Sequence, residues 1–363
     1  MIIFDMIMLK IADMLKNNDL EPVTLYLRIK GVIIIMEKCL EGKVAIVTGS
    51  GQGIGKGIAI GLARLGAKVI TNNRKPNGYS AQQYHKEDMP EEDWNEFCRL
   101  KGDAQVAADT INAEGGEAIP FFGDCSNWET AEKMVKTAVD TWGRIDIIVN
   151  NAAGMGTGDI ATMDEKNFRL FMDSRNHGAV ALMHYALPYM KEQGYGRIIN
   201  VSSDAWLGLA NNDGYSASTA AMVGLTWAAA KELDKFGITV NCICPQGESP
   251  AHAVEYNALI RQITAAGHAP DPKILAVVEA DHGDPVNLAP FCAVLCLDDY
   301  INGSVFSIKS SGRFQAYSQP ALGKMITNGD KGPLWDVEEL RKAVKEEMLG
   351  PDYKAPGKDY GWK

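Results

Sequence analysis

Three glycines follow a short apolar run and mark a tight turn. The run Val44–Val47 contains only Val, Ala and Ile, as expected of a strand that is covered on both faces. Gly49, Gly53 and Gly55 come next, and the segment 56–65 then carries the apolar spacing of a helix. Residues without a Cβ let the backbone approach a ligand closely. Because free N–H groups and the positive end of the dipole lie at a helix N-terminus, this turn predicts a pyrophosphate site.

The elements that would position this turn alternate between strand and helix. Such alternation predicts a parallel sheet flanked by helices, with right-handed crossovers. We therefore expect an α/β fold, namely a single doubly wound (Rossmann) domain over 36–312 with a seven-stranded parallel sheet. The strands are expected at 44–48, 68–72, 118–122, 145–149, 196–201, 239–243 and 304–308.

Two connections are longer than a crossover requires. The first, 75–116, is polar and predicts a solvated excursion, with a lid or a subunit contact anchored by Tyr84, Trp94 and Phe97 as the alternative. The second, 246–286, follows the sixth strand. Because ligands bind beyond the carboxyl ends of parallel strands, we expect it to form a helical substrate lid. Its apolar and small residues are Ala251, Val254, Ala258, Leu259 and Ile263.

The two ends of the chain differ from the central domain. Residues 1–35 form an N-terminal extension in which 2–15 could be a short amphipathic helix, and translation in nature is expected to start at Met36. Residues 313–363 form a C-terminal extension, expected to run along the surface after Gly312. Within it, 336–348 predicts an amphipathic helix with Asp336 near its start.

Composition excludes several classes of partner. The chain has 363 residues and a net charge of −10, so we expect no nucleic-acid partner and no anionic membrane surface. Seven cysteines are scattered without a C-x-x-C pair or a histidine at metal-ligand spacing, so no metal site is predicted. An odd cysteine count without a framework fits a reducing compartment, and a cytoplasmic location is expected.

Five motifs lie on the alternating elements in a consistent order. They are TGSGQGIG at 48–55, Asp124 after the third strand, NNAAG at 150–154, NVSS at 200–203 and YSAS at 215–218. Together they resemble the short-chain dehydrogenase/reductase family, over roughly residues 42–312. The long second crossover and the ending GSVFSIKSSGRF (303–314) are similar, more weakly, to the hydroxyacyl-CoA dehydrogenase part of peroxisomal multifunctional enzymes.

The family resemblance implies roles for residues around Tyr215. In similar enzymes a tyrosine exchanges a proton with the substrate oxygen, and a serine on the fifth strand bonds that oxygen. Tyr215 and Ser203 match these roles, with Ser202 as the alternative because the spacing to Tyr215 is one residue short. The family lysine, four residues after the tyrosine, is replaced here by Thr219, and the family asparagine on the preceding helix is replaced by Arg175.

The substitution at Arg175 has two interpretations. Its guanidinium could point into the cleft and restore part of the positive charge that the lysine would supply. Alternatively it could pair with Asp173 or Asp164 on the surface. We therefore name Ser203, Tyr215, Thr219 and Arg175 as the candidate catalytic set.

The end of the second strand predicts the cofactor. Enzymes that bind NAD usually place a carboxylate there to bond the ribose 2′-OH. Asn73 stands at that position, and Arg74 and Lys75 follow it. A guanidinium can grip a 2′-phosphate, so NADP(H) is favoured over NAD(H). Gln52 weighs against this preference, because many NADP-binding relatives have a basic residue in the glycine turn.

The resemblance implies a longer set of cofactor-binding residues. Asp124 could accept bonds from the adenine amino group, or could instead be the N-cap of the helix that follows it. The full set is Gly49, Ser50, Gln52, Gly53, Ile54, Gly55, Asn73, Arg74, Asp124, Cys125, Asn151, Ala152, Ala153, Tyr215 and Pro245.

These observations predict an NAD(P)-dependent oxidoreductase that acts on a carbonyl or secondary alcohol, such as a hydroxyacyl-CoA or a bulky ketone. The alternative is a catalytically impaired subunit that supports an active paralogue, because the family lysine and asparagine are missing. Similar proteins pack the corresponding helices against copies of themselves. The segment 215–236 is rich in Ala, Gly and Met, so we expect a homodimer or homotetramer, or a complex with a paralogue.

Overall fold

The computed structural model describes residues 25–29, 32–36, 38–76, 86–154, 158–320, 325–327 and 336–349. The chain divides into two compact units, Met1–Tyr317 and Ser318–Lys363. The predicted helix at 2–15 and the anchor Tyr84 lie outside the described residues, as do the side chains of Ala251 and Leu259.

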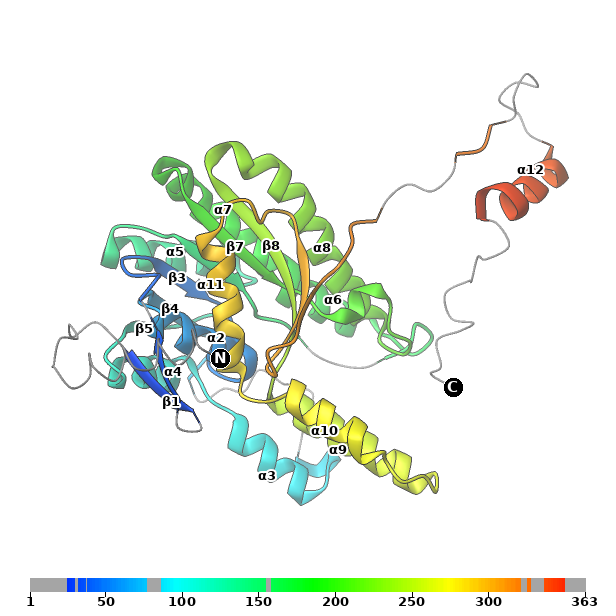
Figure 1. Cartoon of the computed structure of the whole chain (residues 1–363), viewed down its shortest axis with the longest axis horizontal. Helices are drawn as coiled ribbons and strands as arrows, with labels where there is room; N and C mark the ends of the chain where they lie inside the picture. Colours follow the sequence, from blue (N-terminus) through cyan, green and yellow to red (C-terminus); the bar gives the residue numbers. More distant parts are fainter. Residues whose placement is uncertain are drawn as a thin grey trace, which may run out of the picture. The chain divides into compact units, whose positions relative to one another are not determined.

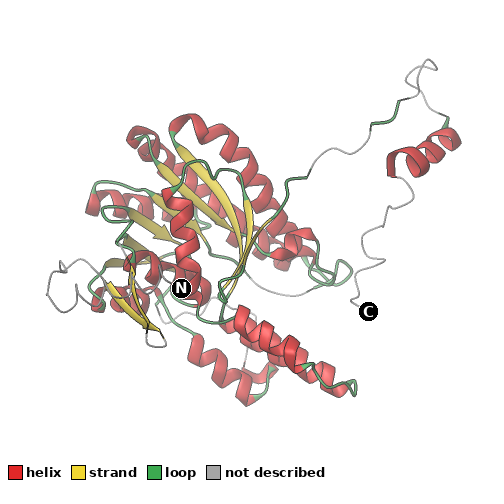
Figure 2. Cartoon of the chain, viewed as in Figure 1, coloured by secondary structure: helices red, strands yellow, loops and turns green. Residues whose placement is uncertain are grey.

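A sheet of eight strands forms the centre of the first unit, in the order β10-β9-β8-β7-β6-β3-β4-β5 (Figures 1 and 2). Seven of these strands are parallel, and all seven lie where the sequence predicts them. Their bounds are β3 Val44–Val47, β4 Lys68–Asn73, β5 Glu117–Phe122, β6 Ile147–Asn150, β7 Gly196–Val201, β8 Ile238–Gln246 and β9 Val305–Lys309.

The expected strand count of seven is wrong by one. β10 (Phe314–Ala316) pairs antiparallel with β9, where the sequence predicts only a surface tail. A tight turn reverses the chain, since Gly312 adopts φ +82° and its N–H donates to the Lys309 carbonyl at 2.9 Å. β10 is short and exposed, so it carries no buried hydrophobic pattern that would have marked it as a strand.

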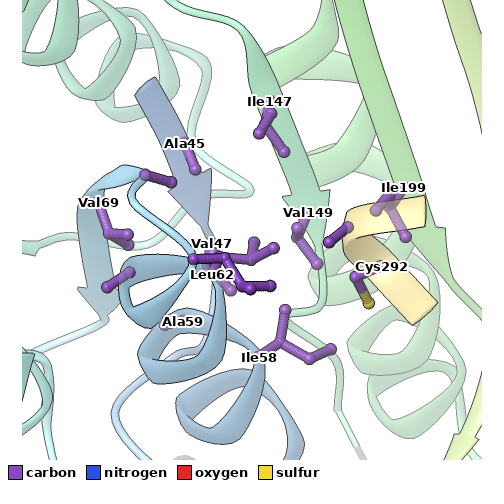
Figure 3. Close-up of a cluster of buried hydrophobic side chains, with 14 of the residues drawn as sticks. Ala45, Val47, Ile58, Ala59, Leu62, Val69, Ile147, Val149, Ile199 and Cys292 are labelled. Carbon is purple, nitrogen blue, oxygen red and sulfur yellow. The ribbon is translucent and has the colours of Figure 1, made fainter. Parts of the chain in front are cut away.

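Helices cover both faces of the sheet, which confirms the doubly wound fold. One face packs against α2 (Gly53–Arg64), α4 (Ala104–Ala113) and α11 (Ala289–Leu297), through a core that includes Ile58 and Val149. Figure 3 shows these side chains converging between α2 and the strands. The other face packs against α5 (Trp128–Trp142), α7 (Gly178–Gln193) and α8 (Asp213–Leu233).

The first long connection contains α3 (Glu91–Leu100), and the second contains α9 (Pro250–Ala265) and α10 (Pro272–Asp281). The helical prediction for 246–286 is therefore confirmed. α3 lies along α9, as Figure 1 shows. Phe97 is fully buried and Asp93 is 1% exposed. The interpretation of α3 as a solvated excursion is therefore wrong, because the helix packs on the predicted lid.

The remaining elements are short. β1 (Leu25–Ile29) and β2 (Val32–Met36) form an antiparallel pair. In the second unit α12 (Val337–Ala343) continues into a π-helical turn at Val344–Leu349, and its N-cap is Asp336, as predicted. The others are α6 (Glu165–Met172), a π-helical turn at Asp173–His177, and 3-10 turns at Lys86–Asp88, Asp204–Leu207, Asp234–Phe236 and Pro285–Leu288.

Candidate active site

A cavity of about 880 Å³ lies beyond the carboxyl ends of the central strands. It collects most of the residues predicted from the sequence. Those that line it are Gly49, Gln52, Gly53, Ile54, Gly55, Asn73, Arg74, Cys125, Asn151, Ala152, Ala153, Arg175, Ser203, Tyr215 and Pro245. Three predicted residues, Ser50, Asp124 and Thr219, are not in its lining.

The glycine turn is packed so closely that side chains would not fit. A Cβ on Gly55 would stand 2.3 Å from Asn151 Nδ2, and Gly49 and Gly53 adopt φ values of +63° and +53°. Gln52 is the N-cap of α2 but makes no side-chain capping bond. The first-turn N–H groups of α2 therefore have no side-chain cap, as a pyrophosphate site requires.

Ser50 is a structural residue. It is fully buried, its hydroxyl donates to the Val47 carbonyl at 2.7 Å, and it accepts from the Asn72 N–H at 2.9 Å. Asn72 also bonds the turn, since its Oδ1 accepts from the Gly49 N–H at 3.3 Å. These bonds fix the turn to the end of β4, so Ser50 supports the cavity wall from behind.

Asn73 ends β4 and Arg74 follows it, and the structure shows which groups these two side chains contact. Asn73 is 5% exposed, and its buried Oδ1 has no hydrogen-bond partner among the described residues. Arg74 lies on the cavity wall, where its Nε is 3.2 Å from Asp124 Oδ2. Asp124 is not the helix N-cap, because Asn127 caps α5 and Asp124 instead accepts two bonds from Ser126. Asp124 therefore orients Arg74 rather than lining the cavity itself.

The NNAAG segment joins the glycine turn to the centre of the sheet. Asn151 Nδ2 donates to the Thr48 carbonyl at 2.9 Å and to the Gly49 carbonyl at 3.2 Å. Thr48 Oγ1 accepts from the N–H groups of Asn151 and Ala152, each at 3.0 Å. These bonds hold the wall at Ala152 and Ala153 against the turn. Cys125, also on the wall, is a poor nucleophile because burial raises the pKa of its thiol to about 12.

Tyr215 and the two candidate serines meet at the other side of the cavity. Tyr215 lies in the first turn of α8, and its ring packs edge-on against Phe171 with centroids 6.4 Å apart. Ser202 is buried and its hydroxyl donates to the Thr219 carbonyl at 2.9 Å. Ser203 Oγ accepts from the Ala205 N–H at 3.3 Å, which leaves its own hydrogen available to a ligand. Ser203 is therefore better placed than Ser202 to bond a substrate oxygen.

Arg175 points into the site rather than to the surface. It is 4% exposed, and its Nη1 donates to the Val201 carbonyl at 2.9 Å. Its guanidinium carbon lies 5.0 Å from the Tyr215 ring centroid, a cation–π contact. The alternative of a surface pair is wrong, because Asp173 instead contacts His177 at 3.0 Å. A π-helical turn at Asp173–His177 sets the direction of this side chain.

Thr219 does not reach the cavity. It is fully buried, and its hydroxyl donates to the Ser216 carbonyl at 2.9 Å within α8. Its side chain offers no charge and no group directed at a ligand. The inclusion of Thr219 in the catalytic set is therefore corrected, and its backbone carbonyl serves only to hold Ser202.

Sequence reasoning missed the part of the wall that the lid supplies. His252 on α9 stacks face to face on His282, with ring centroids 3.4 Å apart. His282 lies at the C-cap of α10, and its Nδ1 is 2.9 Å from the Val278 carbonyl. No sequence pattern pairs two residues on separate helices. The lining also includes Ser202, predicted as the alternative serine, and Phe97 and Ala258, predicted in the two long connections. The other missed lining residues are Asn72, Gly123, Ser174, Val201, Leu209, Asn212, Gln246, Gly247, Ser249, Pro250 and Gln262.

The two long connections are bonded to each other above the cavity. Asp93 accepts from Asn257 Nδ2 at 3.0 Å and from Arg261 Nη1 at 3.1 Å. Arg99 Nη2 donates to Glu248 at 2.6 Å. Across the described ranges, no group of three His, Cys, Asp or Glu side chains is placed to hold a metal ion. The same part of the chain includes no helix that is long and apolar enough to cross a membrane.

A doubly wound sheet with a glycine turn, an Asn151 brace and a Tyr–Ser pair defines a dinucleotide-dependent dehydrogenase class. The family model for short chain dehydrogenases matches residues 91–258. An uncharacterized oxidoreductase of Thermotoga maritima is 39% identical over 206 residues, which cover 56% of this chain and 71% of that protein. The chain belongs to the short-chain dehydrogenase family.

Two further comparisons agree with this assignment. The peroxisomal hydratase-dehydrogenase-epimerase of Saccharomyces cerevisiae is 34% identical over 212 residues, 58% of this chain and 21% of that protein. The weaker predicted likeness to peroxisomal multifunctional enzymes is therefore confirmed. The crystal structure of a short chain dehydrogenase from Mycobacterium avium superposes with a TM-score of 0.63 at 28% identity, covering 84% of this chain and 94% of that one.

Proposed function

We propose that this protein is an oxidoreductase that interconverts a carbonyl compound and a secondary alcohol with NADP(H). The observation that carries this proposal is the shared cavity, which has the glycine turn on one side and Tyr215 with Ser203 on the other. A nicotinamide, when bound, supplies or accepts a hydride at the substrate carbon. The side chains of this chain would then have to bind the substrate oxygen and move its proton.

Tyr215 is the proposed proton donor in reduction. As hydride adds to the carbonyl carbon, the π electrons move to oxygen, and that oxygen takes the proton of the Tyr215 hydroxyl. The phenolate then regains a proton from water. Ser203 donates a hydrogen bond to the same oxygen and so stabilises the charge that develops there. The hydroxyl of Tyr215 has no partner among the described residues, so it is available for this transfer.

The NADP(H) preference rests on Arg74. Its side chain lines the cavity at the end of β4 and is 34% exposed. Asp124 holds the guanidinium in place, and Asn73 supplies no carboxylate that would repel a 2′-phosphate. These features support binding of the 2′-phosphate by Arg74.

The apolar part of the cavity wall supports a substrate larger than a simple alcohol. Leu209, Pro250 and Ala258 give the cavity an apolar wall. A hydroxyacyl thioester or a bulky ketone is the substrate class that fits this wall and the likeness to the peroxisomal enzymes. We also propose a cytoplasmic location and a homodimer or homotetramer, with α8 as a contact surface because Ala220 and Gly224 are exposed on it.

The experiment that tests the function combines binding and turnover. NADPH and NADH are titrated into the purified protein, and ketones and 3-ketoacyl thioesters are then added while NADPH absorbance is followed. We expect NADPH binding, turnover, and a loss of roughly 10²- to 10⁴-fold in rate for Tyr215→Phe. Failure of both nucleotides to bind would remove the cofactor proposal and leave only the fold.

A second candidate function is a supporting subunit of a complex with an active paralogue. The buried Thr219 in place of the family lysine favours it, because the side chain at this position carries no amine. In that case NADPH binds without turnover, Thr219→Lys does not rescue activity, and the protein co-purifies with a homologue that has the complete motif. Turnover by the isolated protein would eliminate this candidate.

A further inference from the structure

Arg175 brings a positive charge to the cavity wall without a balancing carboxylate. The side chain is 4% exposed and lines the cavity. Its Nη1 is bonded to the Val201 carbonyl, but its buried Nε has no hydrogen-bond partner among the described residues, and no described Asp or Glu forms an ion pair with it. A buried charge of this kind is unfavourable unless a counter-ion accompanies it.

Two other arginines of this chain, Arg64 and Arg144, use the Nε–Nη2 edge to bind a carboxylate, whereas Nε of the buried Arg197 donates to the Cys296 carbonyl. Arg64 donates through Nε and Nη2 to Glu114, both at 2.7 Å. Arg144 donates through the same two atoms to Asp146, at 2.7 and 2.6 Å. In Arg175 the Nη1 is taken by a backbone carbonyl, and the Nε–Nη2 edge has no acceptor among the described residues. Nε is itself buried, so Nη2 is the nitrogen of this edge that is available to a carboxylate in the cavity.

The position of Arg175 separates it from the pyrophosphate site. The glycine turn follows β3, whereas Arg175 is bonded to the last residue of β7, and β6 lies between these two strands. Arg175 lies over the ring of Tyr215, on the side of the cavity that holds the candidate proton donor. An oxidised nicotinamide near Tyr215 is cationic and would add to the unbalanced charge. The missing anion is therefore expected from the substrate.

We infer that the substrate is an oxo acid, with a carboxylate close to the carbonyl, and that this carboxylate binds the guanidinium of Arg175 through Nη2. The inference rests on the proposed carbonyl reduction and narrows its substrate class. An acyl thioester meets the requirement only if it keeps a free carboxylate. Arg175 thereby acts as the residue that selects the acid and orients its carbonyl toward Tyr215.

The test compares matched substrates and matched variants. Short 2-oxo and 3-oxo acids are assayed with NADPH beside their methyl esters, which have the same carbonyl without the charge. In the wild type we expect kcat/KM for the best acid to exceed that for its ester on the order of 100-fold, since the charge-assisted contact with Arg175 is lost in the ester. Arg175→Met should remove this preference, because kcat/KM should fall much more for the acid, mainly through a higher KM, than for the ester.

Two further variants make the result specific. Arg175→Lys keeps the charge but loses the planar fork, so we expect an intermediate preference for the acid. Arg169→Met removes an exposed arginine on α6 that pairs with Glu165 at 2.8 Å. It should leave kcat/KM unchanged for both the acid and the ester. Equal wild-type rates with acid and ester would overturn the inference while the reductase function stands. An equal loss with both substrates in Arg175→Met would also overturn it.

A binding measurement separates this inference from the proposed reaction. Calorimetry with the corresponding 2-hydroxy and 3-hydroxy acids and NADP⁺ reports binding of the carboxylate without turnover. Binding by the wild type that Arg175→Met abolishes supports the anion site even if no substrate is reduced. In that event the reductase proposal fails and the anion site remains. No difference between wild type and Arg175→Met contradicts the anion site.

Discussion

The two sides of the cavity differ in which groups the protein bonds itself, although Asn73 Oδ1 beside the turn also has no partner among the described residues. On the glycine-turn side (Thr48–Gly55 with Asn151 and Ala152), the backbone of the turn is bonded by Asn72 and Asn151. In the catalytic corner (Ser174–Asn176, Ser202, Ser203 and Tyr215), the buried atoms Arg175 Nε and Asn176 Oδ1 have no partners among the described residues.

This difference indicates what each side is built to do. Close packing fixes the backbone conformation of the turn, so its function depends on the absence of side chains there. The corner depends on the presence of particular side chains, of which Arg175, Ser203 and Tyr215 line the cavity. We therefore expect substitutions in the turn to abolish binding, and substitutions in the corner to change which molecule is bound or reduced.

The largest effect is expected for Gly51→Ala in the turn. A Cβ there would stand 1.8 Å from Asn73 Oδ1 and 2.5 Å from the backbone carbon of Asp103, so the turn would have to move. NADPH affinity should fall by more than about 100-fold, with overpacking lowering the unfolding free energy by about 1–3 kcal/mol. Fluorescence titration and thermal unfolding measure these quantities. Gly158→Ala, where no atom lies within 4 Å of the new Cβ, is the control and should bind normally.

A smaller effect is expected for Arg74→Met at the edge of the turn side. Loss of a charged contact to the 2′-phosphate should weaken NADPH binding roughly 10- to 30-fold, with little change for NADH. Titration of both nucleotides against wild type and variant measures the ratio. Lys133→Met, an exposed lysine that pairs with Glu129 on α5, is the matched control. An equal change for both nucleotides would reject the NADP(H) preference.

The contact between the two long connections should respond to Asp93→Asn. Asp93 is buried and accepts from Arg261 and Asn257 on α9. Loss of its charge should weaken one charge-assisted contact, so hydrogen-exchange protection of the α9 amides should fall roughly tenfold. Glu91→Gln, exposed at the start of the same helix, should leave the protection unchanged. Unaltered exchange in Asp93→Asn would show that α3 does not hold the lid.

The smallest effect is a dependence of stability on pH from the stacked histidines. Burial, with the neighbouring His282 as a smaller cause, lowers the pKa of His252 to about 4, and burial also lowers the pKa of His282. Because the unfolded chain binds a proton at His252 near pH 6.5 and the folded chain does not, stability should decline as pH falls from 6.5 toward 4.

His252→Gln tests this dependence. Each site contributes at most about 1.4 kcal/mol per pH unit within that window, so the variant should lose less stability than the wild type between pH 6.5 and 5. Thermal unfolding at both pH values measures the difference, with His184→Gln on the exposed side of α7 as the control. Other groups also face the pair. Tyr256 stacks on His252, and the charges of Asp281 and Lys309 have opposite effects on the pKa of His282, since Asp281 raises it and Lys309 lowers it. Parallel pH curves for wild type and His252→Gln would contradict the assignment.

Much of the fold could be predicted because its signals are local. The seven parallel strands and the glycine turn depend on runs of apolar residues and on glycines near them in sequence. β10 was missed because it is three residues long and exposed, so no hydrophobic pattern marks it. The burial of α3 was missed because its partner, α9, lies far along the chain. The contact is also made by an ion pair, so polar residues such as Asp93 give no apolar pattern that would predict it.

The sequence by itself determined the architecture, the position of the glycine turn and the identity of the residues at Arg175 and Thr219. These follow from periodicity and from counting along the chain, which need no knowledge of distant contacts. Only the tertiary structure decided that Arg175 turns inward while Thr219 stays inside the protein. The physical reason is that a side chain's direction depends on the helix turn that carries it and on what packs around it. Here a π-helical turn and the end of β7 place the charge beside Tyr215.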